Sequence, residues 1–354
     1  MKLNYKRTIC VGFAFFLICA FWQAYDNTIP LILTNKFGMS QTWSGVIMAL
    51  DNILALFLLP LFGAISDRSH SKKGRRTPFI VVGTLIAAVA LVALSFVDMA
   101  QLNNIKDVSA IDDPAALVTI YEKEKDETLL TPDGVRFTLA DKFSQEEFAA
   151  IRSQIQDGDK THTNPDYTDY VVPARQAYAW QVTAESPATL VFFIILLLVV
   201  LVSMATFRSP AVALMPDLTP KPLRSRANAI INLMGTLGGV FTLAATGLLV
   251  TRDATGRENY SALFLAVSIL MLAAVVVLLL TIRENRLARE VELQNLATQG
   301  EDAAQAQADE TPSTGAGFSS LDPALRRSLI LILCSVSLWF MGYNAVTTAF
   351  TKYV

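Results

Sequence analysis

Seven long apolar stretches constrain this chain more than any other feature of its sequence. They cover, approximately, residues 9–34, 43–65, 78–97, 187–208, 227–250, 262–282 and 328–350. Each is long enough to cross a bilayer, because a spanning helix needs roughly 20 mostly apolar residues. Charged residues make up only 17% of the 354 residues, whereas soluble domains carry about 25%. We therefore predict an all-α membrane protein.

The first stretch begins like a signal peptide, because Lys2, Lys6 and Arg7 precede it. No small-residue cleavage pattern ends it, and it continues to Leu33. That length exceeds the apolar region of a signal peptide. We interpret the stretch as an uncleaved first span.

The charges of the short loops predict the orientation of the spans. Lys and Arg favour the cytoplasmic side of a membrane, and here they gather at residues 2–7, 68–76, 221–226 and 283–289. These segments alternate along the chain with short loops that hold few basic residues. We predict a multi-pass protein of the cell (plasma or inner) membrane, with a cytoplasmic N-terminus and residues 98–180 on the extracytoplasmic side.

The apolar stretches divide the chain into five predicted parts. These are transmembrane helices 1–3 in residues 1–97, an extracytoplasmic insertion in 98–180, helices 4–6 in 181–283, a cytoplasmic linker in 284–324 and helix 7 in 325–354. Residues 297–320 of the linker contain almost nothing to bury. Because a linker follows six spans and the chain ends within the seventh, we expect a six-helix bundle plus the first helix of a second bundle, in a C-terminally truncated chain.

The insertion contains two local folding signals. Leu129–Thr131 and Val135–Thr138 flank the turn sequence Pro-Asp-Gly, which predicts a hairpin. Ser144 and Glu147 form a capping box, which predicts a helix with Phe148, Ile151 and Ile155 on one face. The sequence leaves two alternatives open, a small α+β domain and a partly disordered insertion.

A strongly basic turn separates the second and third spans. Asp67 closes the second span, and Arg75 and Arg76 precede Pro78, which suits the first turn of the third. We expect Asp67 to pair with one of these arginines or with a neighbouring helix end. Such ion pairs can hold one side of a transporter closed. The alternative is a basic loop that only fixes the topology.

The spacing in this turn resembles a known signature. Gly63-x-x-x-Asp67-Arg68 followed by Gly74-Arg75-Arg76 resembles the loop 2–3 signature of the major facilitator superfamily. The five-residue spacer 69–73 resembles the plant sucrose transporters and their relatives among the glycoside–pentoside–hexuronide:cation symporters. Residues 213–219, Ala-Leu-Met-Pro-Asp-Leu-Thr, and 226–229, Arg-Ala-Asn-Ala, are similar to two further segments of that group.

This resemblance covers the seven spans and not the insertion. It implies a major-facilitator fold and a transporter that works by alternating access. The transporter would carry a sugar, either a disaccharide or a glycoside, together with a cation. The predicted cytoplasmic gate consists of Gly63, Asp67, Arg68, Gly74, Arg75, Arg76, Arg208 and Asp217. For Arg208 we also consider contact with substrate, or extension to the inner surface.

Two departures from the family pattern bear on coupling. Val212 stands where sucrose transporters carry an Arg, and Ala55 and Leu59 stand where the melibiose-type branch carries two Asp residues. The resemblance therefore implies that the sodium site of that branch is missing. This favours H⁺ over Na⁺ as the coupling cation.

Two carboxylates lie within the apolar stretches. Asp26 and Asp51 each sit eight residues from the outer end of a span, which places them roughly 12 Å below the outer surface at about 1.5 Å per residue. Charged residues within a membrane are costly and mark functional sites. Two carboxylates in one site raise one pKa, as proton coupling requires, so we predict both for cation coupling. The alternatives are separate hydrogen bonds to neighbouring helices, or an outer vestibule.

Aromatic and amide side chains surround these carboxylates. The pattern aromatic–aromatic–x–small–Tyr–Asp/Asn occurs at 21–26 and again at 339–344, as expected of two parallel repeats. Sugars need bidentate polar groups and an aromatic face. The predicted substrate-binding residues are Trp22, Gln23, Tyr25, Asp26, Asn27, Asn52, Asn232, Tyr343 and Asn344. The alternative for Trp22 and Tyr25 is packing against lipid or other helices.

We predict a transporter and not an enzyme, with no cofactor, metal or nucleic-acid partner. Its partners would be a sugar, a coupling cation, the bilayer and the C-terminal helices that follow the seventh span. Two other functions stay open. One is transport of another small solute by the same fold, and the other is a seven-span receptor or scaffold that uses the insertion.

Overall fold

The computed structural model describes residues 3–157, 160–252 and 258–306, and scattered residues from 323 to 342. The chain divides into two compact units, Met1–Leu287 and Ala288–Val354. The first unit contains the membrane helices and the insertion. In the second, the described part is mainly the continuation of α11 (Glu284–Ala306).

Six helices in the described residues are long and apolar enough to cross a membrane. They are α1 (Tyr5–Leu31), which continues into the π-helix η1 (Ile32–Lys36), α2 (Gln41–Arg68), α3 (Thr77–Asn104), α8 (Ala188–Asp217), α9 (Arg224–Leu249) and α10 (Ser261–Thr281). They correspond to the first six predicted spans, and the all-α membrane fold is confirmed. The predicted seventh span, 328–350, lies largely outside the described residues.

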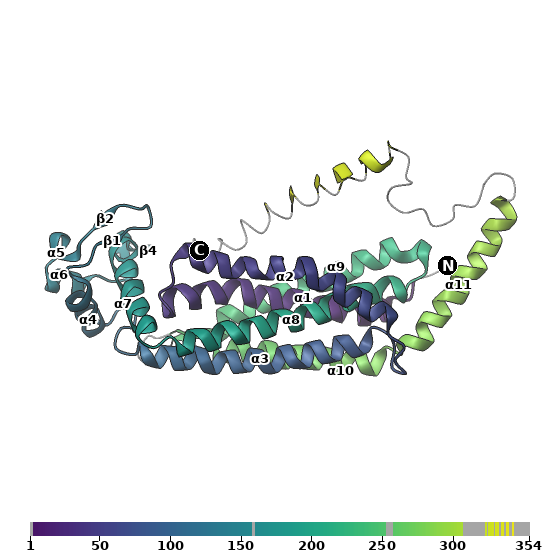
Figure 1. Cartoon of the computed structure of the whole chain (residues 1–354), viewed down its shortest axis with the longest axis horizontal. Coiled ribbons are helices and arrows are strands. Elements are labelled where there is room, and N and C mark those ends of the chain that lie inside the picture. The colour runs from purple at the N-terminus through teal and green to yellow at the C-terminus, as the bar shows by residue number, and fades with distance from the viewer. Residues whose placement is uncertain are drawn as a thin grey trace. The chain divides into compact units, whose positions relative to one another are not determined.

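The six helices pack side by side along their lengths (Figure 1). α1 packs against α9 and α10, whereas α3 packs against α8 and α10, and α2 packs mainly against α8. α1 and α9 approach so closely that a Cβ atom at Gly238 would overlap the main chain of Phe16. Small residues permit such contacts where helices meet in membranes.

Pro30 changes the geometry of the first span. Proline lacks a backbone N–H and weakens a helix around it, and here the α-helix gives way to the π-helix η1 directly afterwards. The Thr34 hydroxyl donates to the Pro30 carbonyl at 2.8 Å within the turn that follows. The span therefore has a local irregularity between Asp26 and its end.

The basic segments meet at one end of the bundle, which we call the basic end. Arg7 donates from Nη2 to the carbonyl of Leu218 at 2.8 Å and to that of Leu287 at 3.3 Å. Asn285 donates from Nδ2 to the Lys72 carbonyl at 2.9 Å. The start of α1, the turn between α2 and α3, the end of α8 and the start of α11 are therefore joined there. The opposite end carries the insertion, and we call it the insertion end.

The insertion between α3 and α8 folds around a core of its own. Its helices are α4 (Pro114–Glu124), α5 (Leu139–Lys142), α6 (Gln145–Ala150), the π-helix η2 (Tyr167–Val171) and α7 (Val172–Glu185). Its two hairpins pair β1 (Leu129–Leu130) with β2 (Arg136–Phe137), and β3 (Gln154–Asp157) with β4 (Lys160–Thr163). The core includes Leu117, Ile120, Leu139 and Phe148, none of which is exposed. Of the two alternatives, the structure has the small α+β domain.

The local predictions for the insertion are confirmed with one exception. The first hairpin pairs Leu129 with Phe137, and α6 carries the expected capping box between Ser144 and Glu147. The exception is the predicted helix face, which is wrong for Ile151 and Ile155, because α6 ends at Ala150 and Ile151 is already extended. Ile155 lies in β3 with 45% of its surface exposed.

Two further short elements complete the described chain. The 3-10 helix η3 (Lys221–Leu223) connects α8 to α9, and the strands β5 (Thr251–Arg252) and β6 (Glu258–Asn259) form a hairpin between α9 and α10.

A buried ion pair connects α1 to α3 at the insertion end. The Lys36 Nζ lies 2.7 and 2.8 Å from the two Asp98 oxygens, and the exposed fractions of the two side chains are 5% and 0%. Lys36 also lies 4.6 Å from the centre of the Tyr260 ring. Beside the pair, Gln101 donates from Nε2 to the Lys36 carbonyl and to the Thr183 hydroxyl, both at 3.0 Å. This network joins α7 of the insertion to the membrane helices.

We expect Lys36→Met to lower the free energy of unfolding by about 3–5 kcal/mol, because it leaves Asp98 charged and buried without its partner. The double variant Lys36→Met/Asp98→Leu should recover most of that loss, since apolar replacements of a buried pair are often neutral. Denaturation of the detergent-solubilised protein measures both. A double variant that is no more stable than the single variant would contradict the prediction that the unpaired charge of Asp98 causes the loss.

A single carboxyl group inside the insertion makes its stability depend on pH. Glu124 is buried at the end of α4, and Gln181 of α7 donates to its Oε2 at 3.3 Å. Its Oε1 has no hydrogen-bond partner among the described residues. Burial, with a smaller contribution from nearby Glu127, raises the pKa of Glu124 to about 7 from its usual 4.5. The folded insertion therefore favours the protonated form.

We expect the insertion to lose stability as pH rises from about 4.5 to about 7 and to change little above that range. In this interval the folded state holds a proton that the unfolded state has released. Hydrogen-exchange protection of α4 and α7, corrected for intrinsic rates, measures the slope in the full chain. Glu124→Gln should flatten it, whereas Glu122→Gln, at an exposed position on the same helix, should not. Equal slopes in all three proteins would refute the assignment.

Candidate functional site

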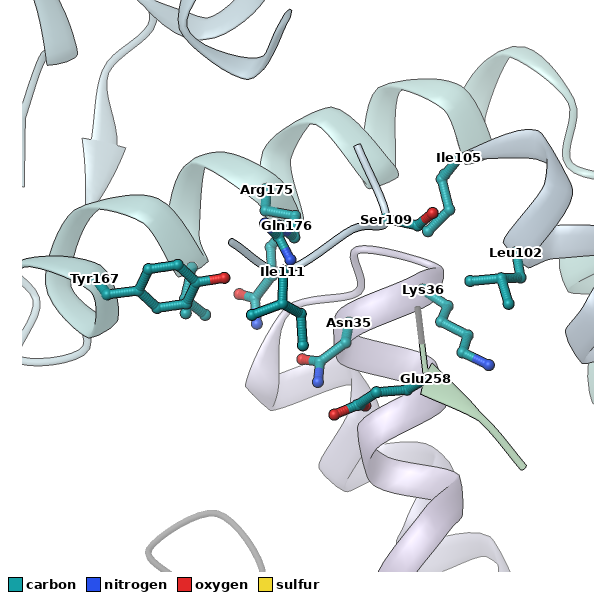
Figure 2. A pocket seen from close by; sticks show the side chains of 11 residues that line it. Asn35, Lys36, Leu102, Ile105, Ser109, Ile111, Tyr167, Arg175, Gln176 and Glu258 are labelled. Carbon is teal, nitrogen blue, oxygen red and sulfur yellow. The ribbon is translucent and has the colours of Figure 1, made fainter. Parts of the chain in front are cut away.

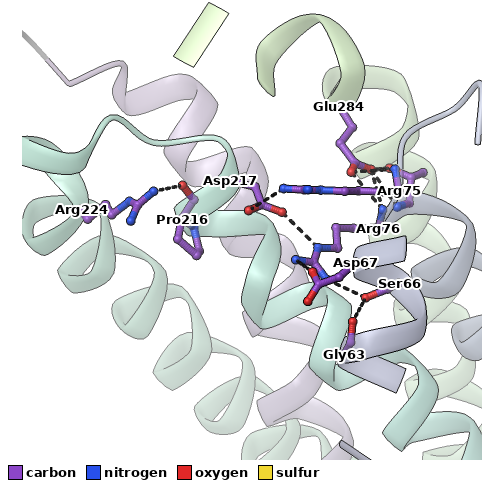
Figure 3. Close-up of polar contacts among 10 residues, drawn as sticks. Gly63, Ser66, Asp67, Arg75, Arg76, Pro216, Asp217, Arg224 and Glu284 are labelled. Atoms are coloured by element: carbon purple, nitrogen blue, oxygen red, sulfur yellow. Dashed lines mark hydrogen bonds and ion pairs between the residues drawn. The ribbon is translucent and has the colours of Figure 1, made fainter. Parts of the chain in front are cut away.

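Arg76 is the centre of an ion-pair network at the basic end (Figure 3). Its Nε donates to Asp217 Oδ2 at 3.0 Å and its Nη1 to the Ser66 hydroxyl at 2.6 Å, while its Nη2 pairs with Asp67. The Arg76 side chain is only 6% exposed. One guanidinium thus joins α2 and α8 to the start of α3. Guanidinium groups suit this role because five N–H donors lie in one rigid plane.

Asp217, the last residue of α8, accepts from two arginines. Besides Arg76, Arg75 Nη2 lies 3.1 Å from Asp217 Oδ1. The exposed fraction of Asp217 is 17%, compared with 46% for Arg75 and 58% for Asp67. Because exposed pairs contribute little, the Arg76–Asp217 pair is the strongest of these contacts.

Glu284, which sequence reasoning missed, caps the start of α3 from the first turn of α11. Its carboxylate accepts from the backbone N–H groups of Arg75 and Arg76 at 2.9 Å and of Thr77 at 2.8 Å. The Thr77 hydroxyl adds a bond of 2.7 Å. A carboxylate satisfies the free N–H groups at a helix start and complements its dipole. Its position just after the sixth span was the only signal in the sequence.

Gly74 permits this cap. Its backbone φ is +118°, which residues with a side chain rarely adopt. A Cβ atom there would also overlap the Glu284 side chain. Gly63 likewise allows α2 to approach α8, since a Cβ atom would lie 2.9 Å from the Ser209 hydroxyl. Both predicted glycines therefore lie at close contacts of the basic end.

Two predicted gate residues lie outside this network. Arg68 is exposed at the end of α2. The guanidinium of Arg208 lies 5.6 Å from the centre of the Trp22 ring. Arg208 cannot join the network, because nine residues of helix separate it from Asp217 by about 13 Å. Of its three predicted roles, this position fits contact with a substrate best.

A second group of polar residues lies in the middle of the membrane helices, and we call it the α1 polar cluster. Its members are Trp22, Tyr25, Asp26 and Asn27 of α1, Asp51 of α2 and Arg208 of α8. Trp22 and Tyr25 meet edge to face with ring centres 5.3 Å apart, and Phe21 supports both rings. The rings are thereby held in one orientation.

Several polar atoms of this cluster are buried without a partner among the described residues. They are Trp22 Nε1, the Tyr25 hydroxyl and Asn27 Nδ2. A buried donor without a partner costs about 1–3 kcal/mol, so native proteins contain very few such donors. Trp22 and Tyr25 lie on one face of α1, whereas Asn27, two residues beyond Tyr25, points to the other side. The two aromatic donors together mark a place where a polar ligand can bind.

The charged members of the cluster lie close enough to interact electrostatically, Asp26 with Asp51 and Asp51 with Arg208. Asp51 accepts from Asn52 Nδ2 at 2.9 Å. Asp26 has no hydrogen bond or ion pair among the described residues. The joint role of the two carboxylates in coupling stays a prediction.

Other predicted binding residues lie apart from the cluster. Gln23 faces Gly239 of α9. Asn232 lies on an exposed face of α9 and donates to the Asn228 carbonyl at 2.9 Å. Tyr343 and Asn344 lie outside the described residues, so their proposed place opposite Trp22 stays a prediction.

Two family models match the chain. Residues 177–354 match the model of the Major Facilitator Superfamily, and residues 10–101 match a model described as MFS/sugar transport protein. The first alone covers half of the chain. The chain therefore belongs to the major facilitator superfamily, a family of multi-pass membrane transporters.

Two sucrose transport proteins of Arabidopsis thaliana are similar to part of the chain. SUC4 is 37% identical over 59 residues, which are 17% of this chain and 12% of that protein. SUC3 is 37% identical over 67 residues, which are 19% of this chain and 11% of that protein. The similar stretch thus spans only a small part of these relatives. No solved structure matches the chain significantly.

We expect Asp217→Asn to lower the free energy of unfolding by about 1–3 kcal/mol, the range for hydrogen bonds to charged groups, because buried Arg76 loses its main counter-charge. Asp67→Asn should cost less than about 1 kcal/mol, as for an exposed pair. Denaturation in detergent compares the two variants. An equal loss in both would show that Asp217 has no special weight in the network.

Proposed function

We propose that this chain forms the N-terminal bundle of a sugar:cation symporter that works by alternating access. The observation that carries the proposal is the α1 polar cluster. It combines aromatic faces, unused hydrogen-bonding groups and charges within helices that are otherwise apolar. Binding sites of transporters lie near the middle of the membrane, between helical repeats.

The chemistry of the cluster fits a sugar. Trp22 offers an aromatic face to the C–H side of a sugar ring, while Trp22 Nε1 and the Tyr25 hydroxyl are free to meet its hydroxyl groups. Asn27 would need a second contact from the other side of α1. The sugar-transport family model and the sucrose transport proteins of Arabidopsis thaliana support this substrate class.

For coupling, we assign Asp26 and Asp51 to the binding of a proton. Two carboxylates close to each other resist simultaneous ionisation, so one of them can pick up a proton at one side of the membrane and release it at the other. Asp26 is the stronger candidate, because it has neither an ion pair nor a hydrogen bond among the described residues. Arg208 would respond to the charge of Asp51 and would orient the substrate.

The network around Arg76 is our proposed cytoplasmic gate. It holds α2 and the start of α3 against the end of α8, and Glu284 fixes the same turn. Opening this end would separate Arg76 from Asp217. The excess of Lys and Arg at the basic end supports a cytoplasmic position for this gate, with the insertion outside the cell.

Alternating access requires a second bundle, which would include the predicted seventh span. α2 and α9 are the least buried spans, with 6% and 22% of their most apolar windows buried. We propose that their free faces contact lipid and that second bundle. Tyr343 and Asn344 would then complete the sugar site.

We expect Asp26→Asn to abolish proton-driven accumulation of sucrose while sucrose exchange across the membrane persists, because the amide keeps its shape but cannot cycle a proton. Uptake into proteoliposomes containing the full-length protein, with and without a pH gradient, measures this. Asp166→Asn, at an exposed position of the insertion, is the matched control and should accumulate sucrose normally.

Normal accumulation by Asp26→Asn would remove Asp26 as the coupling group. Uptake of labelled monosaccharides, organic acids or drugs in place of sucrose would assign the cluster to another solute.

A further inference from the structure

A cavity of about 160 Å³ lies at the insertion end, where the insertion meets the membrane helices (Figure 2). It is separate from the α1 polar cluster, since Asn35 in its wall lies nine residues beyond Asp26, or about 13 Å along the helix. The walls come from η1, from the end of α3 and the loop after it, from η2 with α7, and from β6. Neither the gate nor the α1 polar cluster uses it.

The cavity presents polar groups from several elements. Figure 2 shows Asn35 of η1 beside Glu258 of β6, with Arg175 and Gln176 of α7 across from them. The Gln176 side-chain amide makes no hydrogen bond among the described residues. Two amides and a carboxylate from three separate elements therefore converge on one small space.

Arg175 is held in place and still has an unused donor. Its Nη2 donates to the Ala110 carbonyl at 3.0 Å, and its guanidinium lies 5.9 Å from the centre of the Tyr167 ring. Its Nε is buried and has no partner among the described residues. Because this Nε is not reachable from the cavity, only the outer nitrogens of the fixed guanidinium are available to a ligand oxygen.

The same cavity has an apolar side. Tyr167 contributes an aromatic ring, and Leu102, Ile105 and Ile111 contribute aliphatic surface. A ligand that fits must therefore have one face rich in hydroxyl groups and another rich in C–H groups. Pockets for drug-sized ligands measure about 300–1,000 Å³, so this smaller cavity suits a single ring. Arg175 and Glu258 carry opposite charges, and Lys36, which also lines the cavity, is paired with Asp98. This balance favours a neutral ligand.

We propose that this cavity binds one neutral sugar ring, at a site distinct from the transport site. Asn35, Gln176 and Glu258 would hydrogen-bond its hydroxyl groups, Arg175 would donate to a ring or hydroxyl oxygen, and Tyr167 would cover its C–H face. A ligand held by η1 and α7 together would also strengthen the attachment of the insertion to the first span. The proposal goes beyond transport and does not require it.

Calorimetric titration of the full-length protein with glucose and with sucrose tests the site in a Trp22→Ala background, where the α1 polar cluster has lost its aromatic face. We expect saturable binding of at least one of the two sugars and a rise in melting temperature with it. Gln176→Leu in that background should weaken binding at least tenfold. Gln154→Leu, an equivalent change on the exposed strand β3, should leave binding unchanged.

Asn35→Ala repeats the test from a different element, in case Gln176→Leu does not fold. Absence of saturable sugar binding in the Trp22→Ala background would overturn the proposal, as would unchanged affinity in both cavity variants. Tight binding of glycine without binding of glucose would also overturn the proposal. That result would show that the opposite charges of the cavity bind a zwitterion. Sucrose transport by the wild-type protein is a separate readout, so failure of either proposal can be recognised by itself.

Discussion

The arrangement of the basic end depends on the ion pairs and hydrogen bonds of the buried Arg76 guanidinium. A charge that is only 6% exposed must be matched by counter-charges and hydrogen-bond acceptors, and these come from two other helices through Asp217, Asp67 and Ser66. Glu284 then satisfies the backbone of the same turn from a fourth segment. Because one residue collects partners from so many elements, the relative positions of α2, α3 and α8 are fixed together. Separating any of these helices exposes the same unmatched charge.

Local sequence patterns predicted the features that depend on neighbouring residues. The length of each apolar stretch was enough to predict the six described spans. Pro78 in the first turn of the third span, the capping box at Ser144 and the turn at Gly134 also behave as their local chemistry requires. Contacts between distant segments were harder to predict. Lys36 and Asp98 lie 62 residues apart, and Glu284 acts on a turn more than 200 residues away. Neither contact produces a periodic signal, and a lone charge near the end of a span looks the same whether it is paired or solvated.

Two of the expectations that the structure does not support, for Ile155 and for Arg208, concern the direction of a side chain. Ile155 was expected on the helix of Phe148, but the chain becomes extended at Ile151, and the spacing of a helix no longer applies. Arg208 was grouped with the gate because Arg208 and Asp217 both lie in the inner half of the fourth predicted span. The helix instead directs Arg208 to Trp22, about two and a half turns before Asp217. Position along a helix therefore did not predict which residues Arg208 contacts.

The contrast between the two polar regions of the bundle follows from how completely each is satisfied. At the basic end nearly every buried charge meets a carboxylate, a guanidinium or a backbone group, so this region gains little from a ligand and is suited to holding helices together. In the α1 polar cluster, donors on α1 remain unmatched in surroundings that are otherwise apolar. Leaving such groups unmatched is costly, and selection for stability alone would favour apolar side chains there. Their presence is consistent with selection for binding. The weakness of the helix after Pro30 lies next to them, where movement of a span would change access to the cluster.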